Sequence, residues 1–214
     1  MSTFTKIALG AMGKLRPKPA LGISTASIRL PAPERQGGMP LLEALASRHS
    51  SRDFARTELP LQLLSNMLWA AFGVNRPDGH RTAPSAINCQ AIDVYVALPS
   101  GAYLYEAAAN SLTLAAAADL RRVTGYQDFV DEAPLDLVYV ANYSRMTMVP
   151  ARDRESFASV AAGAIAQNVY LFAASAGLST VIRAWINRDA VAEALGLSHD
   201  QHTLLSQTVG FPKA

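Results

Sequence analysis

Cysteine is nearly absent from this sequence, with Cys89 the only one among 214 residues. A single cysteine excludes an intrachain disulfide framework and fits a reducing compartment, so we expect a cytoplasmic protein. Strong charge is missing too, because 19 Lys and Arg against 17 Asp and Glu leave a net charge of +2. No basic run with interleaved aromatic residues is present, and nucleic acid is therefore not expected as a partner.

Several motifs of well-known chemistry are also lacking. No Gly-x-Gly-x-x-Gly follows an expected strand and no Walker-type loop occurs, which argues against a Rossmann dinucleotide site and against a phosphate-binding P-loop. The Gly-x-Ser-x-Gly elbow of hydrolases is missing. His199 and His202 stand on a polar stretch without Cys or clustered carboxylates nearby. We expect a surface loop there and no metal site.

A secretion signal and a membrane span are not indicated either. The apolar patch 7–12 is followed at once by Lys14 and Arg16 and by prolines, a poor match to a signal peptide. Residues 158–178 are long enough to cross a membrane. However, Gln167 and Asn168 lie at the middle of this stretch and alanine dominates its apolar residues. We expect a buried helix of a soluble protein, with no membrane partner.

The chain is long enough for one well-buried core and short for two, since half of its residues are hydrophobic. Residues 1–37 contain prolines at positions 17, 19, 31 and 33 and little periodicity. They are expected to form an extended N-terminal arm. Residues 38–214 are expected to form the single domain.

Helices and strands alternate within that domain. Apolar periodicity, caps and glycine stops predict helices at about 39–47, 61–72, 115–124, 154–176 and 187–195. Strands are predicted at 92–98, 102–106, 112–114, 135–143, 180–186 and 203–209. The alternation of Ile92, Val94, Val96 and Leu98 predicts a half-buried strand. The fold class is therefore α+β around a mostly antiparallel sheet.

The first motif that points to chemistry follows the helix at 39–47 and reads Arg48-His49-Ser50-Ser51-Arg52-Asp53-Phe54. It places two guanidinium groups four residues apart with hydroxyl groups between them. Such a set suits a ligand that carries a phosphate and a second electron-rich edge. Two plainer readings stay open: Arg48 offsets the negative end of the helix dipole, and Arg52 pairs with Asp53 or Glu58.

The second motif, Arg81-Thr82-Ala83-Pro84-Ser85-Ala86-Ile87-Asn88-Cys89-Gln90, runs into the strand at 92–98. Pro84, Ser85 and Asn88 are turn and cap formers, so a simple loop is the plainer reading. The amides of Asn88 and Gln90 can each donate and accept hydrogen bonds, as recognition of a polyol or a uracil-like ring requires. Cys89 is either a small packing residue or a neighbour of the ligand.

Both motifs, together with three later segments, resemble the FMN-dependent nitroreductase superfamily. The later segments are Ala166–Leu171, Ala176–Thr180 and Val209–Pro212. All of them occur in the family's order between Gly38 and Pro212. The resemblance implies a nitroreductase-like fold, with helices flanking a mostly antiparallel sheet and a long buried central helix at a dimer interface. It further implies a homodimer with an FMN site in each cleft between the chains.

The resemblance also assigns cofactor-binding positions. Arg48 and Ser50 would face the phosphate and ribityl chain and Arg52 the pyrimidine edge, with His49 in the same segment. The loop expected to pack on the flavin from the neighbouring subunit holds Pro84, Ser85, Ala86 and Asn88. The segment expected near flavin N5 holds Ser179, Thr180 and Val181, whose plainer reading is the start of a strand. Lys213 is the candidate for a further phosphate-binding cation.

The implied reaction is ping-pong hydride transfer from NAD(P)H through flavin N5 to small electron-poor acceptors such as nitroaromatics or quinones. The flavin carries the chemistry, so no side chain is assigned as catalytic. Arg81–Ser85 and the Tyr103-Leu104-Tyr105 stretch are similar to the branch of peptide-azoline dehydrogenases. Dehydrogenation of a heterocyclic, azoline-like substrate is therefore an alternative, and a non-catalytic flavin-binding dimer is another.

Overall fold

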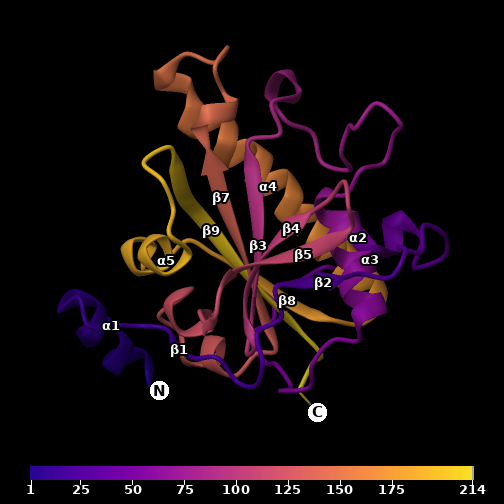
Figure 1. Ribbon diagram of the computed structural model, residues 1–214. Helices are drawn as coiled ribbons and strands as arrows, with labels where there is room; N and C mark the ends of the chain where they lie inside the picture. The colour runs from indigo at the N-terminus through magenta and orange to yellow at the C-terminus, as the bar shows by residue number, and fades with distance from the viewer. Residues whose placement is uncertain (214) are drawn as a thin grey trace.

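A seven-stranded antiparallel sheet forms the centre of the computed structural model, which describes residues 1–213 (Figure 1). Its strands lie in the order β2 (Ser27–Arg29), β5 (Ser111–Ala116), β4 (Gly101–Glu106), β3 (Ile92–Leu98), β7 (Leu135–Asn142), β9 (Gln201–Gly210) and β8 (Ser179–Arg183). Each neighbouring pair is antiparallel. The predicted α+β fold with a mostly antiparallel sheet is confirmed.

Helices cover both faces of this sheet. On one face α3 (Leu61–Phe72) and α4 (Ala151–Ala176) pack against Val94 and Val96 of β3. On the other face α5 (Arg188–Leu195) packs against Tyr95 and Ala97 of the same strand. Residues 92–97 of β3 are consequently all buried. The prediction of a half-buried strand was wrong, because each face of β3 has its own hydrophobic core.

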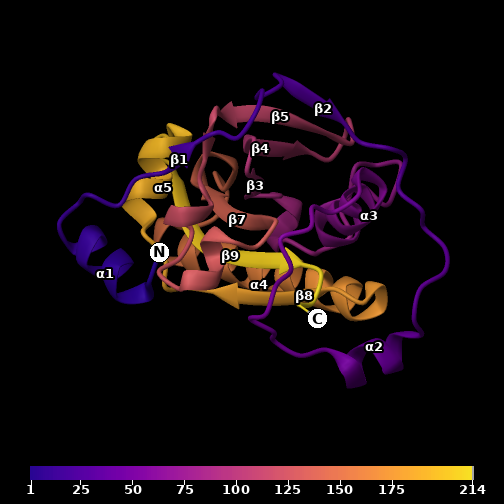
Figure 2. The ribbon, with the colours of Figure 1, turned by 90° about the horizontal axis from the view of Figure 1, so that it is seen from below.

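Helix α4 is the long central helix that the apolar stretch predicted. It ends at Gly177, whose φ of 67° is the left-handed conformation that glycine adopts readily. One side of α4, including Ala158, Ala162, Ile165 and Val169, packs into the core. By length and composition α4 could also cross a membrane, but here it lies along the sheet beside α3 (Figure 2).

The other predicted helices of the domain are confirmed, with one exception. Helix α2 spans Leu41–Ser47, and the side chain of Asn187 accepts a hydrogen bond from the Ala190 N–H at the start of α5. The helix expected at 115–124 does not form. Instead β5 continues to Ala116, β6 (Ala118–Asp119) pairs with β1 (Lys18–Pro19), and a 3₁₀ turn follows at Arg121–Val123. Strand pairing thus overrides the helix propensity of the alanines.

The first 37 residues are less extended than expected. Helix α1 (Thr3–Ala11) begins after Ser2, whose hydroxyl accepts a hydrogen bond from the Thr5 N–H. Beyond α1 the arm is extended, and its short strands β1 and β2 pair with β6 and β5. The division of the chain into an N-terminal arm, residues 1–37, and a domain, residues 38–214, stays a prediction. The prediction of an extended conformation was wrong for residues 3–11, because they form helix α1, which projects from the body of the fold (Figures 1 and 2).

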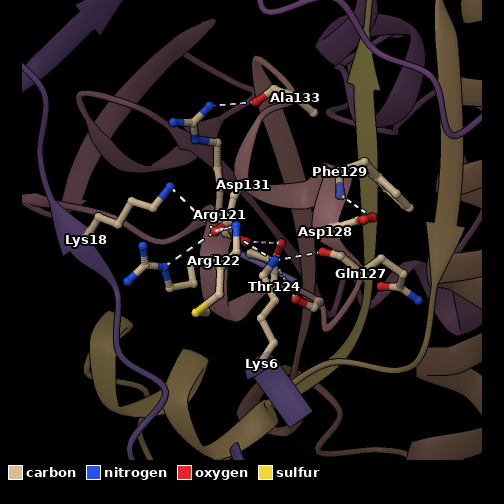
Figure 3. Close-up of polar contacts among 12 residues, drawn as sticks. Lys6, Lys18, Arg121, Arg122, Thr124, Gln127, Asp128, Phe129, Asp131 and Ala133 are labelled. Carbon is tan, nitrogen blue, oxygen red and sulfur yellow. Dashed lines mark hydrogen bonds and ion pairs between the residues drawn. The ribbon is translucent and has the colours of Figure 1, made fainter. Parts of the chain in front are cut away.

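A buried ion pair fixes α1 to the domain (Figure 3). The Lys6 ammonium lies 2.6 Å from Oδ1 of Asp131 and donates to the carbonyl oxygen of Gln127 at 2.7 Å. Lys18 and Arg122 approach the other carboxylate oxygen at 3.6 and 3.5 Å. Burial raises the pKa of Asp131, but Lys6, Lys18 and Arg122 together outweigh it and hold that pKa below its ordinary value. Asp131 is therefore a carboxylate at neutral pH.

Candidate functional site

The first motif lies against the start of β8. Arg48 caps the C-terminal end of α2, and the chain then extends so that the Ser51 N–H donates to the Thr180 carbonyl oxygen at 3.0 Å. The Ser179 hydroxyl donates to Ser51 Oγ at 3.1 Å. Segments 48–52 and 179–181, which are far apart in the sequence, are thus side by side. Val181 itself is buried against Phe54.

Tyr170 of α4 connects the two segments. The Arg48 guanidinium lies over the Tyr170 ring, 5.2 Å from its centroid. The Tyr170 hydroxyl is 2.8 Å from Ser50 Oγ and accepts a hydrogen bond from the Ile182 N–H at 3.0 Å. No role was predicted for Tyr170. The available signal was a tyrosine in an alanine-rich helix, since a buried phenol needs a hydrogen-bond partner.

Two neighbouring cavities open around these segments. The first has a volume of about 390 Å³, and its lining includes His49, Ser51, Tyr170, Ser179, Thr180 and Lys213. The second has about 650 Å³ and is lined partly by Arg52, Phe54 and Phe129. Asp53 and Lys213 line both. The two cavities therefore share these two residues and are of a size that suits a small-molecule ligand, and together they are called the hollow. Of the predicted residues of the two segments, Arg48, Ser50 and Val181 line neither cavity.

The two arginines of the first motif form no ion pair within the part of the chain that the structure describes. Within residues 1–213, no carboxylate lies within 4.0 Å of the Arg48 or Arg52 side chain. The ion pair of Arg52 with Asp53 or Glu58, the plainer reading of the sequence, is therefore not formed. Arg48 does stand at the end of α2, where it also offsets the helix dipole. Hydroxyl groups of Ser50 and Ser51 add neutral donors between the two guanidinium groups.

The second motif lies elsewhere. Its Pro84, Ser85, Ala86 and Asn88 precede β3, in the loops at the top of Figure 1, whereas the C-terminus and the first motif are at the bottom. The Arg145 side chain, shortly before α4, donates to the Gln90 carbonyl oxygen at 3.1 Å. Ser179 instead follows the end of α4. The two motifs thus lie toward opposite ends of a helix of 26 residues, which is about 39 Å long.

The backbone of the second motif is strained. Ile87, Asn88 and Gln90 have φ values of 45°, 53° and 46°, in the left-handed region that side chains other than glycine seldom occupy. Each such residue costs about 1–3 kcal/mol and persists only where its surroundings hold it. Ile87 is also 65% exposed. Strain combined with an exposed apolar side chain marks this loop as a candidate contact surface.

Apolar side chains are also exposed on α2, which lies beside the C-terminal part of α4 at the bottom of Figure 2, and nearer the N-terminal end of α4. On α2 they are Leu41, Leu42 and Leu45, and on α4 they are Phe157 and Val160. Leu42 and Val160 are 77% and 71% exposed. Several large exposed apolar side chains of this kind are typical of an interface with another protein chain.

Comparison with known proteins shows where this arrangement occurs. The sequence profile described as the nitroreductase family matches residues 45–211. A crystal structure of a protein from Ralstonia eutropha JMP134, provisionally assigned as a nitroreductase, is 53% identical with a TM-score of 0.90. The match covers 94% of this chain and 96% of that chain.

Two further relatives are more distant. A protein of Methanocaldococcus jannaschii, also provisionally assigned as a nitroreductase, is 31% identical over 87% of this chain and 96% of its own length. The NADPH:FMN oxidoreductase of Vibrio harveyi, in complex with NAD⁺, is 22% identical with a TM-score of 0.62. That match covers 81% of this chain and 69% of the Vibrio chain, and it shows a shared fold.

Proposed function

The chain belongs to the nitroreductase family of oxidoreductases, and from that premise we propose that it uses FMN to pass hydride from NAD(P)H to electron-poor acceptors such as nitroaromatics or quinones. One observation carries the proposal: the first motif meets Ser179–Thr180 beside a hollow lined by Arg52 and Lys213, and no carboxylate of residues 1–213 pairs with the arginines of that motif. We also propose that the reaction takes place in the cytoplasm, in keeping with the single cysteine.

The residues around the hollow fit FMN. Arg48, His49 and Ser50 would hold the phosphate and ribityl chain, with Lys213, which lines the same cavity as His49, as a second cation. Arg52 would face the pyrimidine edge, where a guanidinium stabilises negative charge and raises the reduction potential. The backbone at 179–181 would border the reactive side of the ring. When bound, FMN would supply the redox chemistry by accepting and then delivering hydride in a ping-pong cycle.

We propose that each site is completed by a second copy of the chain. Two chains packed antiparallel along α4 would bring Pro84, Ser85, Ala86 and Asn88 of one copy to the Arg48 end of the other. The exposed leucines of α2 and the outer side of α4 offer the apolar surface for this contact. The expected assembly is a homodimer with two flavin sites. Light scattering on the eluting protein tests it, and a monomer at micromolar concentration would contradict it.

The first experiment is the visible absorption spectrum of the purified protein before and after anaerobic addition of NADPH. Oxidised-flavin bands that bleach would support both the cofactor and the hydride step. Bands that persist would favour the alternatives, which are dehydrogenation of an azoline-like substrate or a flavin-binding dimer without turnover. A colourless protein that FMN cannot reconstitute would overturn the proposal.

Replacing Arg48 is expected to weaken FMN binding. Arg48→Ala removes a charge-assisted hydrogen bond to the phosphate, which corresponds to a loss of about 1.5–3 kcal/mol. Fluorescence titration of the apoprotein with FMN measures this loss of affinity. Arg76→Ala is the matched control, because Arg76 is an exposed arginine away from the hollow. Equal FMN affinity in the Arg48 variant and in the control would refute the phosphate assignment.

Tyr170→Phe tests whether the Tyr170 hydroxyl positions the Arg48–Ser50 segment. The variant keeps the ring under Arg48 but loses the hydrogen bonds to Ser50 and Ile182. We expect FMN affinity to fall by about 1 kcal/mol and riboflavin affinity to change much less, because only FMN carries the phosphate. Tyr139→Phe, which loses a buried bond to Gln207, serves as control. An equal fall in the affinities for FMN and riboflavin would indicate that the Tyr170 hydroxyl has a purely structural role.

A further inference from the structure

A third cavity, of about 330 Å³, adjoins the hollow near the start of helix α1. Its lining includes Lys18, Arg56, Arg121, Arg122, Asp131 and Glu132. It shares Glu132 with the cavity that Arg52 lines. We propose that this third cavity binds the 2′-phosphate of NADPH, so that the protein uses NADPH in preference to NADH. The proposal deepens the proposed function and rests on it, because that function makes a nicotinamide nucleotide the hydride donor.

The side chains around Asp131 leave an excess of positive charge at this cavity (Figure 3). Lys6, Lys18 and Arg122 approach the Asp131 carboxylate at 2.6, 3.6 and 3.5 Å. One negative charge is thus shared by three positive charges, and two positive charges stay uncompensated. Charges that are partly removed from water attract an anion more strongly than charges in bulk solvent. This cluster therefore favours a doubly charged anion.

The other ion pairs at the cavity add no net charge. Arg121 Nη2 lies 2.7 Å from Asp119 Oδ2, and Arg121 Nε donates to Oδ1 of the same carboxylate at 2.8 Å. At the rim, Arg56 pairs with Glu132 at 3.0 Å, and both side chains are mostly exposed. Because each of these arginines has its own carboxylate, the excess of positive charge comes from the cations around Asp131.

Lys18 and Arg122 have donors that are available to a phosphate. Each side chain is 30% exposed, so both reach the cavity. Among the residues that the structure describes, Asp131 is the only hydrogen-bond or ion-pair partner of either side chain. Arg122 approaches it through Nε, which leaves both terminal nitrogens for a ligand. A guanidinium binds phosphate through two such nitrogens, while lysine adds a point charge.

Asp131 keeps these cations in place before any nucleotide arrives. Its side chain is only 4% exposed, so the carboxylate lies behind the cations and does not face the ligand. It reduces the repulsion among Lys6, Lys18 and Arg122 and compensates one of their three charges. Preorganised cations need little reordering on binding, which favours affinity.

The size of the charge and the position of the cavity point to a nucleotide phosphate. A phosphate monoester has a second pKa of about 6 and is mostly a dianion at neutral pH, whereas a carboxylate carries a single charge. Phe54 and Phe129, whose ring centroids are 5.5 Å apart, line the neighbouring cavity and offer a surface for a nucleobase. Arg52, where the flavin ring is proposed, lines the same neighbouring cavity. Arginine also accommodates the 2′-phosphate in other NADP sites.

Calorimetric titration of the purified protein with adenosine 2′,5′-bisphosphate tests the proposal, with 5′-AMP and inorganic phosphate as comparison ligands. The two nucleotides differ only in the 2′-phosphate. We expect the bisphosphate to bind at least roughly tenfold more tightly than 5′-AMP, because of the charge-assisted hydrogen bonds to that group. Equal affinities for the two nucleotides would overturn the proposal. Inorganic phosphate that binds as tightly as the bisphosphate would show a site for free phosphate and would overturn the assignment to NADPH.

The variants Arg122→Gln and Lys18→Gln locate the bound phosphate. Each should weaken binding of the bisphosphate by roughly tenfold and leave the affinity for 5′-AMP unchanged. Lys6 still compensates Asp131 in both variants, so the fold is retained. Arg16→Gln is the matched control, because Arg16 is an exposed arginine close to Lys18 in the sequence and does not line the cavity. Undiminished affinity for the bisphosphate in both variants would place the phosphate elsewhere and refute the site.

Steady-state kinetics separates this proposal from the proposed function. In Arg122→Gln the ratio of kcat/KM for NADPH to that for NADH should fall by roughly tenfold, through a higher KM for NADPH. A purely structural role of Arg122 would impair both donors equally and would refute the assignment. A wild-type protein that oxidises NADH and NADPH equally well would refute the preference and keep the proposed reaction. Tight binding of the bisphosphate by a protein that cannot hold FMN would refute the proposed reaction and keep the phosphate site.

Discussion

Replacing Asp136 with alanine is expected to lower the free energy of unfolding by about 3–5 kcal/mol, because it leaves a buried arginine without its counter-ion. Asp136 is fully buried on β7, and the Arg183 side chain on β8 is only 4% exposed. Arg183 Nη2 lies 2.7 Å from Asp136 Oδ1. Thr124 and Thr208 also donate to this carboxylate. The network spans three strands, so its loss cannot be repaired by one side chain turning to water.

Urea unfolding of Asp136→Ala, followed by circular dichroism, measures this effect. Glu58→Ala is the matched control, since it removes an exposed carboxylate and should change the stability by less than about 0.5 kcal/mol. Asp136→Asn should fall between the two, because the amide oxygen still accepts hydrogen bonds. A loss below about 1 kcal/mol in Asp136→Ala would show that Arg183 finds another partner.

Replacing Asp131 with alanine is expected to have an effect of the same size, about 3–5 kcal/mol, and to release helix α1. Lys6 has no exposed side-chain surface, and Asp131 is the carboxylate that compensates its charge (Figure 3). Lys18 and Arg122 would lose the same partner and repel Lys6. The apolar double variant Lys6→Met with Asp131→Leu should recover much of the loss, because neither charge then remains buried.

The same ion pair predicts acid sensitivity. The folded-state pKa of Asp131 is lowered, so its stabilising contribution is complete above the ordinary carboxyl pKa near 4 and is lost as pH falls through the folded-state value. Unfolding free energies measured from pH 6 downward should therefore decline more steeply in the wild type than in the double variant. Parallel declines would show that Asp131 does not carry the acid sensitivity.

Much of the fold could be predicted because its signals are local. The apolar face of 61–72, the Gly177 stop after the long helix and the Asn187 cap each identify an element without reference to the rest of the chain. The failures depend on distant partners. Three of the four alanines at 115–118 lie in strands, because Ala116 pairs with Ala102 and Ala118 with Pro19. Helix α1 was missed because Lys6 is buried only through Asp131.

In the candidate site, too, local features could be predicted and contacts between distant segments could not. The Arg48–Arg52 motif was recognisable because its cations and hydroxyl groups are consecutive in the sequence. Its contact with Thr180 and the part played by Tyr170 depend on how α4 lies between the two segments, which local periodicity does not encode. The distance of Asn88 from this hollow within one chain likewise follows from the length of α4. The proposed pairing of two chains rests on this distance between the two motifs.

The anchoring of α1 also has a consequence for biosynthesis. Residues leave the ribosome from the N-terminus, so Lys6 emerges long before the partners that bury it, the Gly125 carbonyl lying 119 positions further along the chain. Strand β2 likewise cannot pair in the sheet until its neighbour β5 has been synthesised. A nascent chain halted between these points would carry α1 in water, with an ammonium group and an apolar face both unpartnered. Helix α1 would thus stay undocked until the segment with Gly125 and Asp131 has been synthesised, and chaperones could bind it in that interval.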